Sequence, residues 1–230
     1  MTIGGALIRR RLVVPAVVVS LLVAALSWYV VGRAVGDAER PCARLWRVSA
    51  ERQDRDVGAG PRIVVIGDSY SVGAGLDRVA ESWPSRLPGR VHVAGFSGSG
   101  FSAGSSPCTG ASYADRAADA VAGGAELVVV EGGLNDTDRS NAEISAGFER
   151  LMRALDGHRV LIVGPAAAPS RLADVPRVDA VLAELSAAHG ATYLPMVDVD
   201  LAYLDDDLHP TTEGHATFGD VVGRAVTGAW

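Results

Sequence analysis

The chain has 230 residues, which allows one compact domain of ordinary size and an appendage. Hydrophobic residues make up 48% and charged residues 21% of the chain, as in globular proteins, and the formal net charge is only −6. The 21 basic residues are scattered and form no basic stripe, which argues against a nucleic-acid-binding protein.

An uncharged apolar run extends from Leu12 to Val31. A helix of about 20 residues, at about 1.5 Å per residue, is just long enough to cross a bilayer core of about 30 Å. Three arginines, residues 9–11, stand directly before the run, so the positive-inside rule predicts a cytoplasmic tail over residues 1–11 and an anchor over residues 12–32. The alternative is a cleaved signal peptide ending near Ala34–Gly36, although the apolar stretch of such peptides usually has only about 7 to 15 residues. Both interpretations place the rest of the chain outside the cytoplasm.

Residues 33–60 mix arginines with acidic residues and end in a glycine-rich stretch. This composition predicts a short juxtamembrane helix followed by a linker, and a globular domain over residues 61–230. The chain has two cysteines, Cys42 and Cys108, which are too few and too far apart for a zinc site built from cysteine pairs. Outside the cytoplasm they are expected to form one disulfide; two buried free thiols are the alternative.

Five short runs rich in β-branched residues alternate with helical patterns in the domain, which predicts a mostly parallel sheet covered by helices on both faces. The expected strands are residues 63–66, 91–94, 127–130, 160–163 and 192–196. Apolar side chains recur at helical spacing over residues 144–155 and 178–185, and their periodicity is typical of helices that pack on a core. Ligands of such sheets bind beyond the carboxyl ends of the strands, so the residues that follow each run are the candidates for function.

The first run is followed by Gly67-Asp68-Ser69-Tyr70. A turn of small residues there places the Ser69 hydroxyl at the carboxyl edge of the sheet. On position alone, a serine after a strand is more often the N-cap of the next helix than a nucleophile.

The second run is followed by a loop rich in glycine and serine that contains Gly98 and Gly100. Glycines let the backbone approach a ligand closely and direct N–H groups at it. Residues 98–103 also match a dinucleotide-binding fingerprint formally, but the loop follows the second run and continues into Pro107, which disrupts the helix that would receive a pyrophosphate. The third run is followed by Asn135, either a turn residue or an amide donor for an oxyanion.

Near the C-terminus an acidic loop, residues 205–207, leads to His209. Of the five histidines, only His209 is expected in a loop beside carboxylates. Histidine is the side chain best suited to take a serine proton near neutral pH, and it needs a carboxylate to fix its tautomer. The other interpretation is a solvated acidic loop with an ordinary histidine before the last helix.

Together these four segments resemble, in order, the motif blocks of the SGNH or GDSL family of esterases and lipases: a glycine-aspartate-serine turn, a glycine, an asparagine and a late D-x-x-H. The resemblance implies a three-layer α/β/α sandwich of the flavodoxin-like SGNH type and no metal or cofactor. It implies Ser69 as nucleophile, Asp206 and His209 as its partners, and an oxyanion hole of Ser69, Gly98 and Asn135.

Two positions depart from the family pattern. Tyr70 stands where the family motif has leucine, and Ala94 where an asparagine often stands, but neither change removes a catalytic atom. The second block is the least certain in register, because Gly100 competes with Gly98 for the donor role. The expected function is hydrolysis of a carboxylic ester, the O-acyl group of a carbohydrate or lipid. The alternatives are acyl transfer to an envelope sugar, a non-catalytic envelope-binding module and a flavodoxin-like nucleotide binder.

Overall fold

The computed structural model describes residues 19–29 and 41–228 and divides into two compact units, Met1–Arg44 and Leu45–Trp230. In the first unit, residues 19–29 are helical. The expected tail, residues 1–11, and about half of the expected anchor, residues 12–32, lie outside the described residues. Among the helices within the described ranges, none is both long and apolar enough to cross a membrane.

The second unit is built on a parallel sheet of five strands in the order β2-β1-β3-β4-β5. The strands are β1 (Arg62–Gly67), β2 (Arg90–Gly95), β3 (Leu127–Glu131), β4 (Val160–Val163) and β5 (Thr192–Leu194). The five-stranded parallel sheet predicted from the sequence is therefore confirmed. The last strand ends two residues earlier than expected, just before Pro195, which has no N–H to donate to a neighbouring strand.

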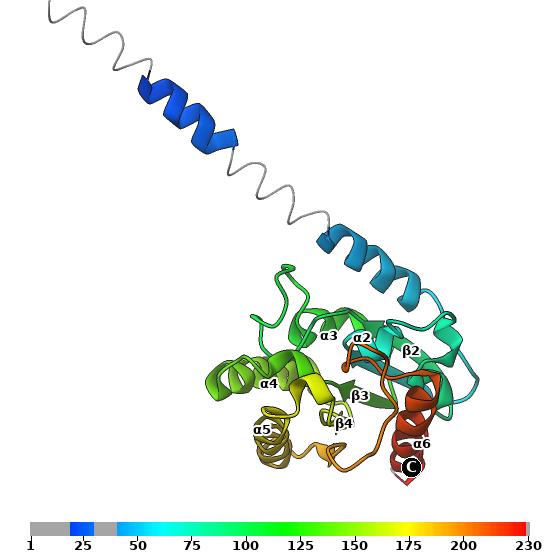
Figure 1. Ribbon diagram of the computed structural model, residues 1–230. Coiled ribbons are helices and arrows are strands. Elements are labelled where there is room, and N and C mark those ends of the chain that lie inside the picture. The colour runs from blue at the N-terminus through cyan, green and yellow to red at the C-terminus, as the bar shows by residue number, and fades with distance from the viewer. Residues whose placement is uncertain (1–18, 30–40, 229–230) are drawn as a thin grey trace, which may run out of the picture. The chain divides into compact units, whose positions relative to one another are not determined.

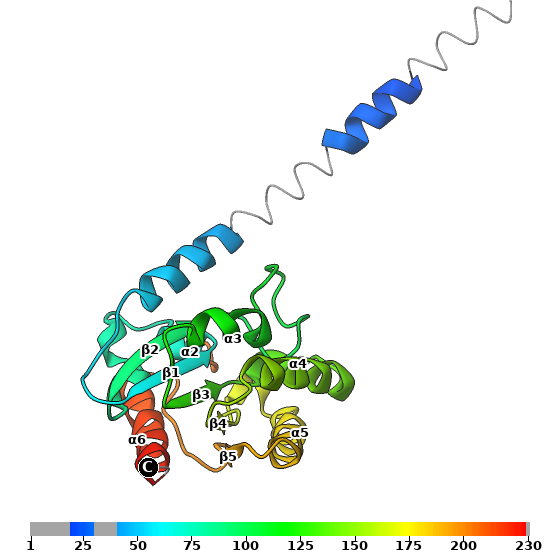
Figure 2. The same ribbon diagram turned by 180° about the vertical axis from the view of Figure 1, so that it is seen from behind.

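Helices cover both faces of the sheet (Figures 1 and 2). One face carries α3 (Tyr113–Val121), α4 (Asn141–Ala154) and α5 (Val175–Ala188), and the other carries α6 (Thr212–Gly228) with the short helix η2 (Trp83–Arg86). Four further helices are short: α2 (Ser69–Val72), η1 (Val79–Glu81), η3 (Leu134–Asp136) and η4 (Pro169–Arg171). Residues 45–53 of this unit are also helical. The arrangement is the three-layer α/β/α sandwich expected from the motifs.

The sequence of the central strand β1 is continuously apolar because both faces of the strand are buried. Successive side chains of a strand point to opposite faces of the sheet. Val64 and Ile66 pack beneath α3 and α4, whereas Ile63 and Val65 pack beneath α6. All four side chains are fully buried, and each face contributes its own hydrophobic core.

Capping residues define the helices of the α3–α4 face. Ser140 and Glu143 form a reciprocal capping box at the start of α4. The sequence prediction missed α3, which begins after the capping Ser112. Its buried residues include two small alanines, Ala117 and Ala120, and the charged Arg116, so its apolar stripe is weak in the sequence.

Residues 45–57 belong to the compact unit, although the sequence suggested a linker up to residue 60 and a domain that begins at residue 61. The Ser49 hydroxyl donates a hydrogen bond to the carbonyl of Gly95, at 2.7 Å. The ring of Trp46 lies 4.6 Å from that of Phe96, centroid to centroid, and Val57 forms an antiparallel bridge with Val91. These polar and aromatic contacts follow no hydrophobic periodicity, which explains why the sequence did not reveal them.

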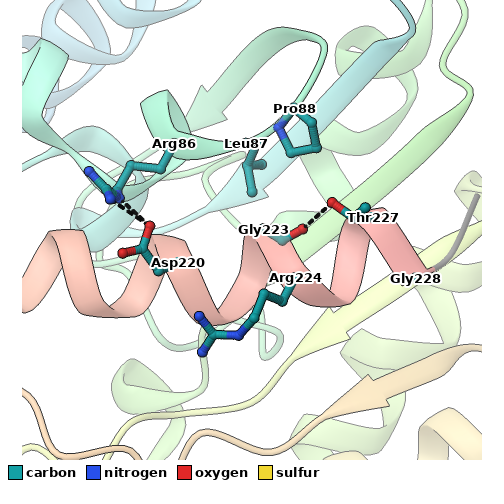
Figure 3. A pocket seen from close by; sticks show the side chains of 8 residues that line it. All are labelled: Arg86, Leu87, Pro88, Asp220, Gly223, Arg224, Thr227 and Gly228. Carbon is teal, nitrogen blue, oxygen red and sulfur yellow. Dashed lines mark hydrogen bonds and ion pairs between the residues drawn. The ribbon is translucent and has the colours of Figure 1, made fainter.

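A surface pocket of about 540 Å³ lies where α6 meets η2 and the residues that follow it (Figure 3). Arg86 reaches from η2 to Asp220 on α6, with Nε 2.6 Å from Oδ1, and this contact lies at one side of the pocket. Two further lining residues, Pro88 and Gly223, offer no reactive side chain. The Asp220 carboxylate is paired with Arg86 and the Thr227 hydroxyl donates to the carbonyl of Gly223, and the pocket lies outside the candidate active site described below.

Candidate active site

Ser69 is the first residue of α2, directly beyond the carboxyl end of β1. The helix is capped by the preceding residue, because the Asp68 side chain accepts a hydrogen bond from the N–H of Tyr70 at 2.9 Å. Ser69 is therefore not the N-cap, which was the other interpretation of its position. Its hydroxyl is free for another role, and the residue keeps 8% of its surface exposed.

His209 joins Ser69 to Asp206 from the loop before α6. Its Nε2 lies 3.0 Å from the Ser69 Oγ, and its Nδ1 lies 2.6 Å from the Asp206 Oδ2. The carboxylate holds the ring proton on Nδ1, which leaves the lone pair of Nε2 facing the serine hydroxyl. Three residues that the sequence placed in one site thus form a continuous hydrogen-bonded row.

Asp206 is the most exposed member of this row, with 47% of its side-chain surface accessible. It is nevertheless held ionised. Hydrogen bonds from the His209 ring, and from the backbone N–H groups of His209 and Leu208, lower its pKa to about 2. The carboxylate therefore stays charged across the pH range in which a histidine base works.

The loop that carries His209 is fixed from several sides. The Tyr70 hydroxyl donates to the carbonyl of Leu208 at 2.5 Å, and the N–H of Leu204 donates to the carbonyl of His209 at 2.8 Å. Asp207 adopts a left-handed backbone conformation with φ of 54°, and its carbonyl accepts from the N–H of Ser170. Tyr70, which stands where the family motif has leucine, thus makes a contact that positions the loop carrying His209.

The sheet order places two further loops on either side of Ser69. Because β1 lies between β2 and β3, the loop with Gly98 and the loop with Asn135 flank the serine at the same sheet edge. Within the part of the chain that the structure describes, neither the N–H of Ser69 nor that of Gly98 has a hydrogen-bond partner. Both are available to a negatively charged oxygen.

The structure separates the roles of Gly98 and Gly100, which compete in the sequence. Gly98 has a φ of 78°, and a Cβ built there would meet no atom within 4 Å, so it faces open space. A Cβ at Gly100 would lie 2.5 Å from the Asp136 carboxylate, inside the protein. Gly98 is therefore the residue that lies open to a ligand, whereas Gly100 is a packing position.

The Asn135 amide connects the three loops. Its Nδ2 donates to the Asp68 Oδ2 at 3.0 Å and to the carbonyl of Ser99 at 2.9 Å. These two bonds use both amide hydrogens. The amide is fixed beside the serine, and an incoming oxyanion has to share one of these hydrogens.

A layer of buried ionisable residues, which the sequence prediction missed, lies beneath the loops. Glu131 is 3% exposed and accepts from the Ser71 hydroxyl at 2.6 Å. Arg116 of α3 is also buried and donates to the carbonyls of Gly67 and Ala94 and to the hydroxyl of Ser99. No sequence signal for Arg116 was available, because the helix that carries it was not predicted.

Asp136, directly after Asn135, organises the glycine-rich loop. Its carboxylate accepts from the N–H groups of Phe101 and Ser102, at 3.0 and 2.8 Å, and from the hydroxyl of Ser105 at 2.6 Å. Burial raises the pKa of Asp136, and these three donors oppose that shift. The residue therefore fixes the loop between β2 and α3, and its place in the third motif was its sequence signal.

Two other predictions concern metals and cysteines. Over the described residues, no group of three or more His, Cys, Asp or Glu side chains is arranged to hold a metal ion. Neither Cys42 nor Cys108 is a free thiol; both are disulfide-bonded.

Comparison with known proteins adds a family match. Residues 65–217 match the GDSL-like Lipase/Acylhydrolase family. The comparison with curated proteins found no match.

Several solved structures share the fold. The inhibitor-bound aryl esterase of M. smegmatis superposes with a TM-score of 0.61 at 17% identity, over 74% of this chain and 100% of that one. Est24, a carbohydrate acetylesterase from Sinorhizobium meliloti, has a TM-score of 0.60 at 16% identity, over 74% and 100% of the two chains.

The position of Asp68 predicts a pH dependence of stability. Burial raises the pKa of this carboxyl from 3.8 to about 7, against the opposing hydrogen bond from Tyr70. Between pH 4 and 7 the folded protein therefore binds more protons than the unfolded chain, so the free energy of unfolding should fall as pH rises. The expected fall is a few kcal/mol, since one unit of pKa shift corresponds to about 1.4 kcal/mol.

Denaturant unfolding of the wild-type protein and of Asp68→Asn at several pH values measures this contribution. The wild-type free energy minus that of the variant should decrease from about pH 4 through pH 7 and level off about one unit above the folded pKa. A difference that does not change with pH would contradict the assigned environment of Asp68.

Proposed function

Because the chain belongs to the GDSL-like lipase/acylhydrolase family and is a carboxylic ester hydrolase, we propose that it uses a Ser-His-Asp triad of Ser69, His209 and Asp206. The hydrogen-bonded row from the Ser69 Oγ through the His209 ring to the Asp206 carboxylate carries this proposal. A serine hydroxyl is a weak nucleophile at neutral pH, and an adjacent imidazole with its own carboxylate partner activates it.

The reaction proceeds in two halves. His209 Nε2 takes the Ser69 proton while the Oγ attacks the ester carbonyl, and the protonated imidazole then gives the proton to the departing alcohol oxygen. In the second half His209 takes a proton from water, whose oxygen attacks the acyl-serine carbonyl. The bond from the acyl carbon to the Ser69 Oγ then breaks, the imidazolium returns the proton to the Oγ, and the carboxylic acid leaves. Asp206 stabilises the imidazolium that forms in each half.

The oxyanion is held by the N–H groups of Ser69 and Gly98 and by the Asn135 amide. The two backbone N–H groups have no other partner among the described residues, which suits them to this task. Asn135 draws one amide hydrogen partly away from the carbonyl of Ser99 or from Asp68 as charge develops on the substrate oxygen. The two bonds it already makes hold its amide in position before substrate arrives.

The substrate we propose is the O-acyl group of a carbohydrate, with a lipid acyl ester as the second candidate. The fold similarity to a carbohydrate acetylesterase supports the first choice. A panel of p-nitrophenyl esters of increasing chain length, run beside acetylated sugars, distinguishes the two classes of substrate.

We place this activity outside the cytoplasm. The uncharged run from Leu12 to Val31 behind three arginines supports export, with residues 12–32 as the anchor. Disulfides persist mainly in oxidising compartments, so the oxidised state of both cysteines supports the same location.

Replacement of the nucleophile or the base should abolish hydrolysis of p-nitrophenyl acetate. We expect kcat/KM of Ser69→Ala and of His209→Ala to fall by about 10⁴-fold or more, since triad members act as a unit. Ser145→Ala and His189→Ala change the same residue types away from the site and should retain wild-type rates. A fluorophosphonate probe should label Ser69 in the wild-type protein and leave Ser69→Ala unlabelled. Full activity in either triad variant would overturn the assignment.

Removal of the Asn135 amide tests the oxyanion hole. Asn135→Ala should lower kcat by about 10²- to 10³-fold with a much smaller change in KM, because the amide acts mainly on charge that appears in the transition state. Asn141→Ala removes the other asparagine of the chain, which pairs with Arg177 on the surface, and serves as the matched control. An unchanged kcat in Asn135→Ala would remove that residue from the oxyanion hole.

The location is tested by the accessibility of the domain in intact bacterial spheroplasts. External protease should degrade the domain of the expressed full chain while a cytoplasmic marker protein stays intact. A domain that becomes sensitive only after lysis would contradict an extracytoplasmic site.

A further inference from the structure

A small cavity lies between residues 45–57 and the body of the catalytic unit. Its volume is about 60 Å³, and it is lined by Val48, Glu51, Arg52, Arg55, Val72 and Val79. Val72 is the last residue of α2, the helix that begins with Ser69. The cavity is therefore separate from the triad but shares a helix with it.

Arg52 is buried in the wall of this cavity without sufficient partners. The residue is 4% exposed, and the one hydrogen bond it makes within the described residues runs from Nη1 to the carbonyl of Arg55, at the long distance of 3.5 Å. Its Nε and Nη2 atoms are buried and have no partner among the described residues. Because nine-tenths or more of buried polar groups in native proteins are hydrogen-bonded, these donors indicate a missing acceptor.

The positive charge of Arg52 indicates that the missing acceptor is an anion. Burial, and then the nearby positive charge of Arg55, lower the pKa of Arg52 to about 10, so the guanidinium remains protonated at neutral pH. A buried charge without a counter-charge is costly. Glu51 also lines the cavity, yet no ion pair joins it to Arg52 among the described residues. The lining therefore carries the two positive charges of Arg52 and Arg55 against the one negative charge of Glu51.

We propose that this cavity binds a small monovalent anion, which accepts hydrogen bonds from the unpartnered Nε and Nη2 of Arg52 and is further held by the charge of Arg55. The volume is about twice the ~30 Å³ that one water molecule occupies in the liquid, which suits chloride or a carboxylate of acetate size. Three valines among the lining residues make the site apolar apart from its charges, which strengthens the attraction to an anion.

The bound anion stabilises the packing of residues 45–57 on the catalytic unit. From the same segment, Ser49 bonds the carbonyl of Gly95, and Trp46 packs on Phe96, at the start of the loop that contains Gly98. An anion that neutralises Arg52 favours the conformation in which these contacts form, because it binds that conformation only.

Thermal unfolding of the full-length protein in detergent micelles tests this site. At tenfold its dissociation constant, chloride or acetate should raise Tm by about 3 to 6 °C over the same concentration of sodium gluconate, whose anion is too large for the cavity. Separate chloride and acetate arms distinguish an inorganic anion from a small carboxylate. An equal response to all three salts would show a general effect of ionic strength and overturn the proposal.

Arg52→Met keeps the apolar stem of the side chain and removes the donors, so its Tm should lose the difference between chloride and gluconate. Arg47→Met, an exposed position on the same helix, should keep that difference. Chloride-35 NMR of the wild-type protein adds a readout that needs no variant: the chloride line should broaden and recover when bromide competes. Absence of broadening at every chloride concentration, with acetate also without effect on Tm, would refute the site. None of these measurements depends on ester hydrolysis.

Discussion

The Asn135 amide is the contact on which the geometry of the candidate site depends. It comes from the loop after β3, and it bonds Asp68 in the turn after β1 and the carbonyl of Ser99 in the loop after β2. Three loops that belong to adjacent parallel strands are thereby held at fixed spacing around Ser69. A single side chain with two N–H groups suits this role, because each hydrogen bond directs the amide toward a different loop.

The buried layer beneath the loops explains why these loops keep their conformation. Asp68, Glu131 and Asp136 are buried carboxyls, and burial raises the pKa of each. Their oxygens accept hydrogen bonds from loop N–H and hydroxyl groups, and Arg116 supplies a buried positive charge beside them. Such a network is stable only when its donors and acceptors are satisfied together, so it selects one arrangement of the loops. The rigid part of the site is therefore polar, whereas the apolar cores lie deeper in the sheet.

The sequence predicted the sheet and most of the site because both leave local patterns. Apolar runs marked the five strands, and the ends of the first three identified Ser69, Gly98 and Asn135 as neighbours. Features set by long-range polar contacts left no such pattern. Arg116 bonds backbone carbonyls from two strands, and Ser49 joins residues 45–57 to the end of β2, 46 positions along the chain. Periodicity reports which face of an element is apolar, but a hydrogen bond between distant loops depends on the completed fold.

Residues 45–57 pack on the domain and do not act as a linker to it. A linker leaves the domain independent of whatever precedes it, whereas this segment contacts Gly95 and Phe96, and Gly98 follows two residues later. On the other side of the cavity, Arg52 lies near Val72, at the end of the helix that Ser69 begins. The segment thus contacts the supports of both the nucleophile and a backbone N–H that we assign to the oxyanion hole. Because Arg52 is buried with unsatisfied donors, the anion that we propose for this cavity would strengthen these contacts. Residues 45–57 therefore support the candidate site structurally.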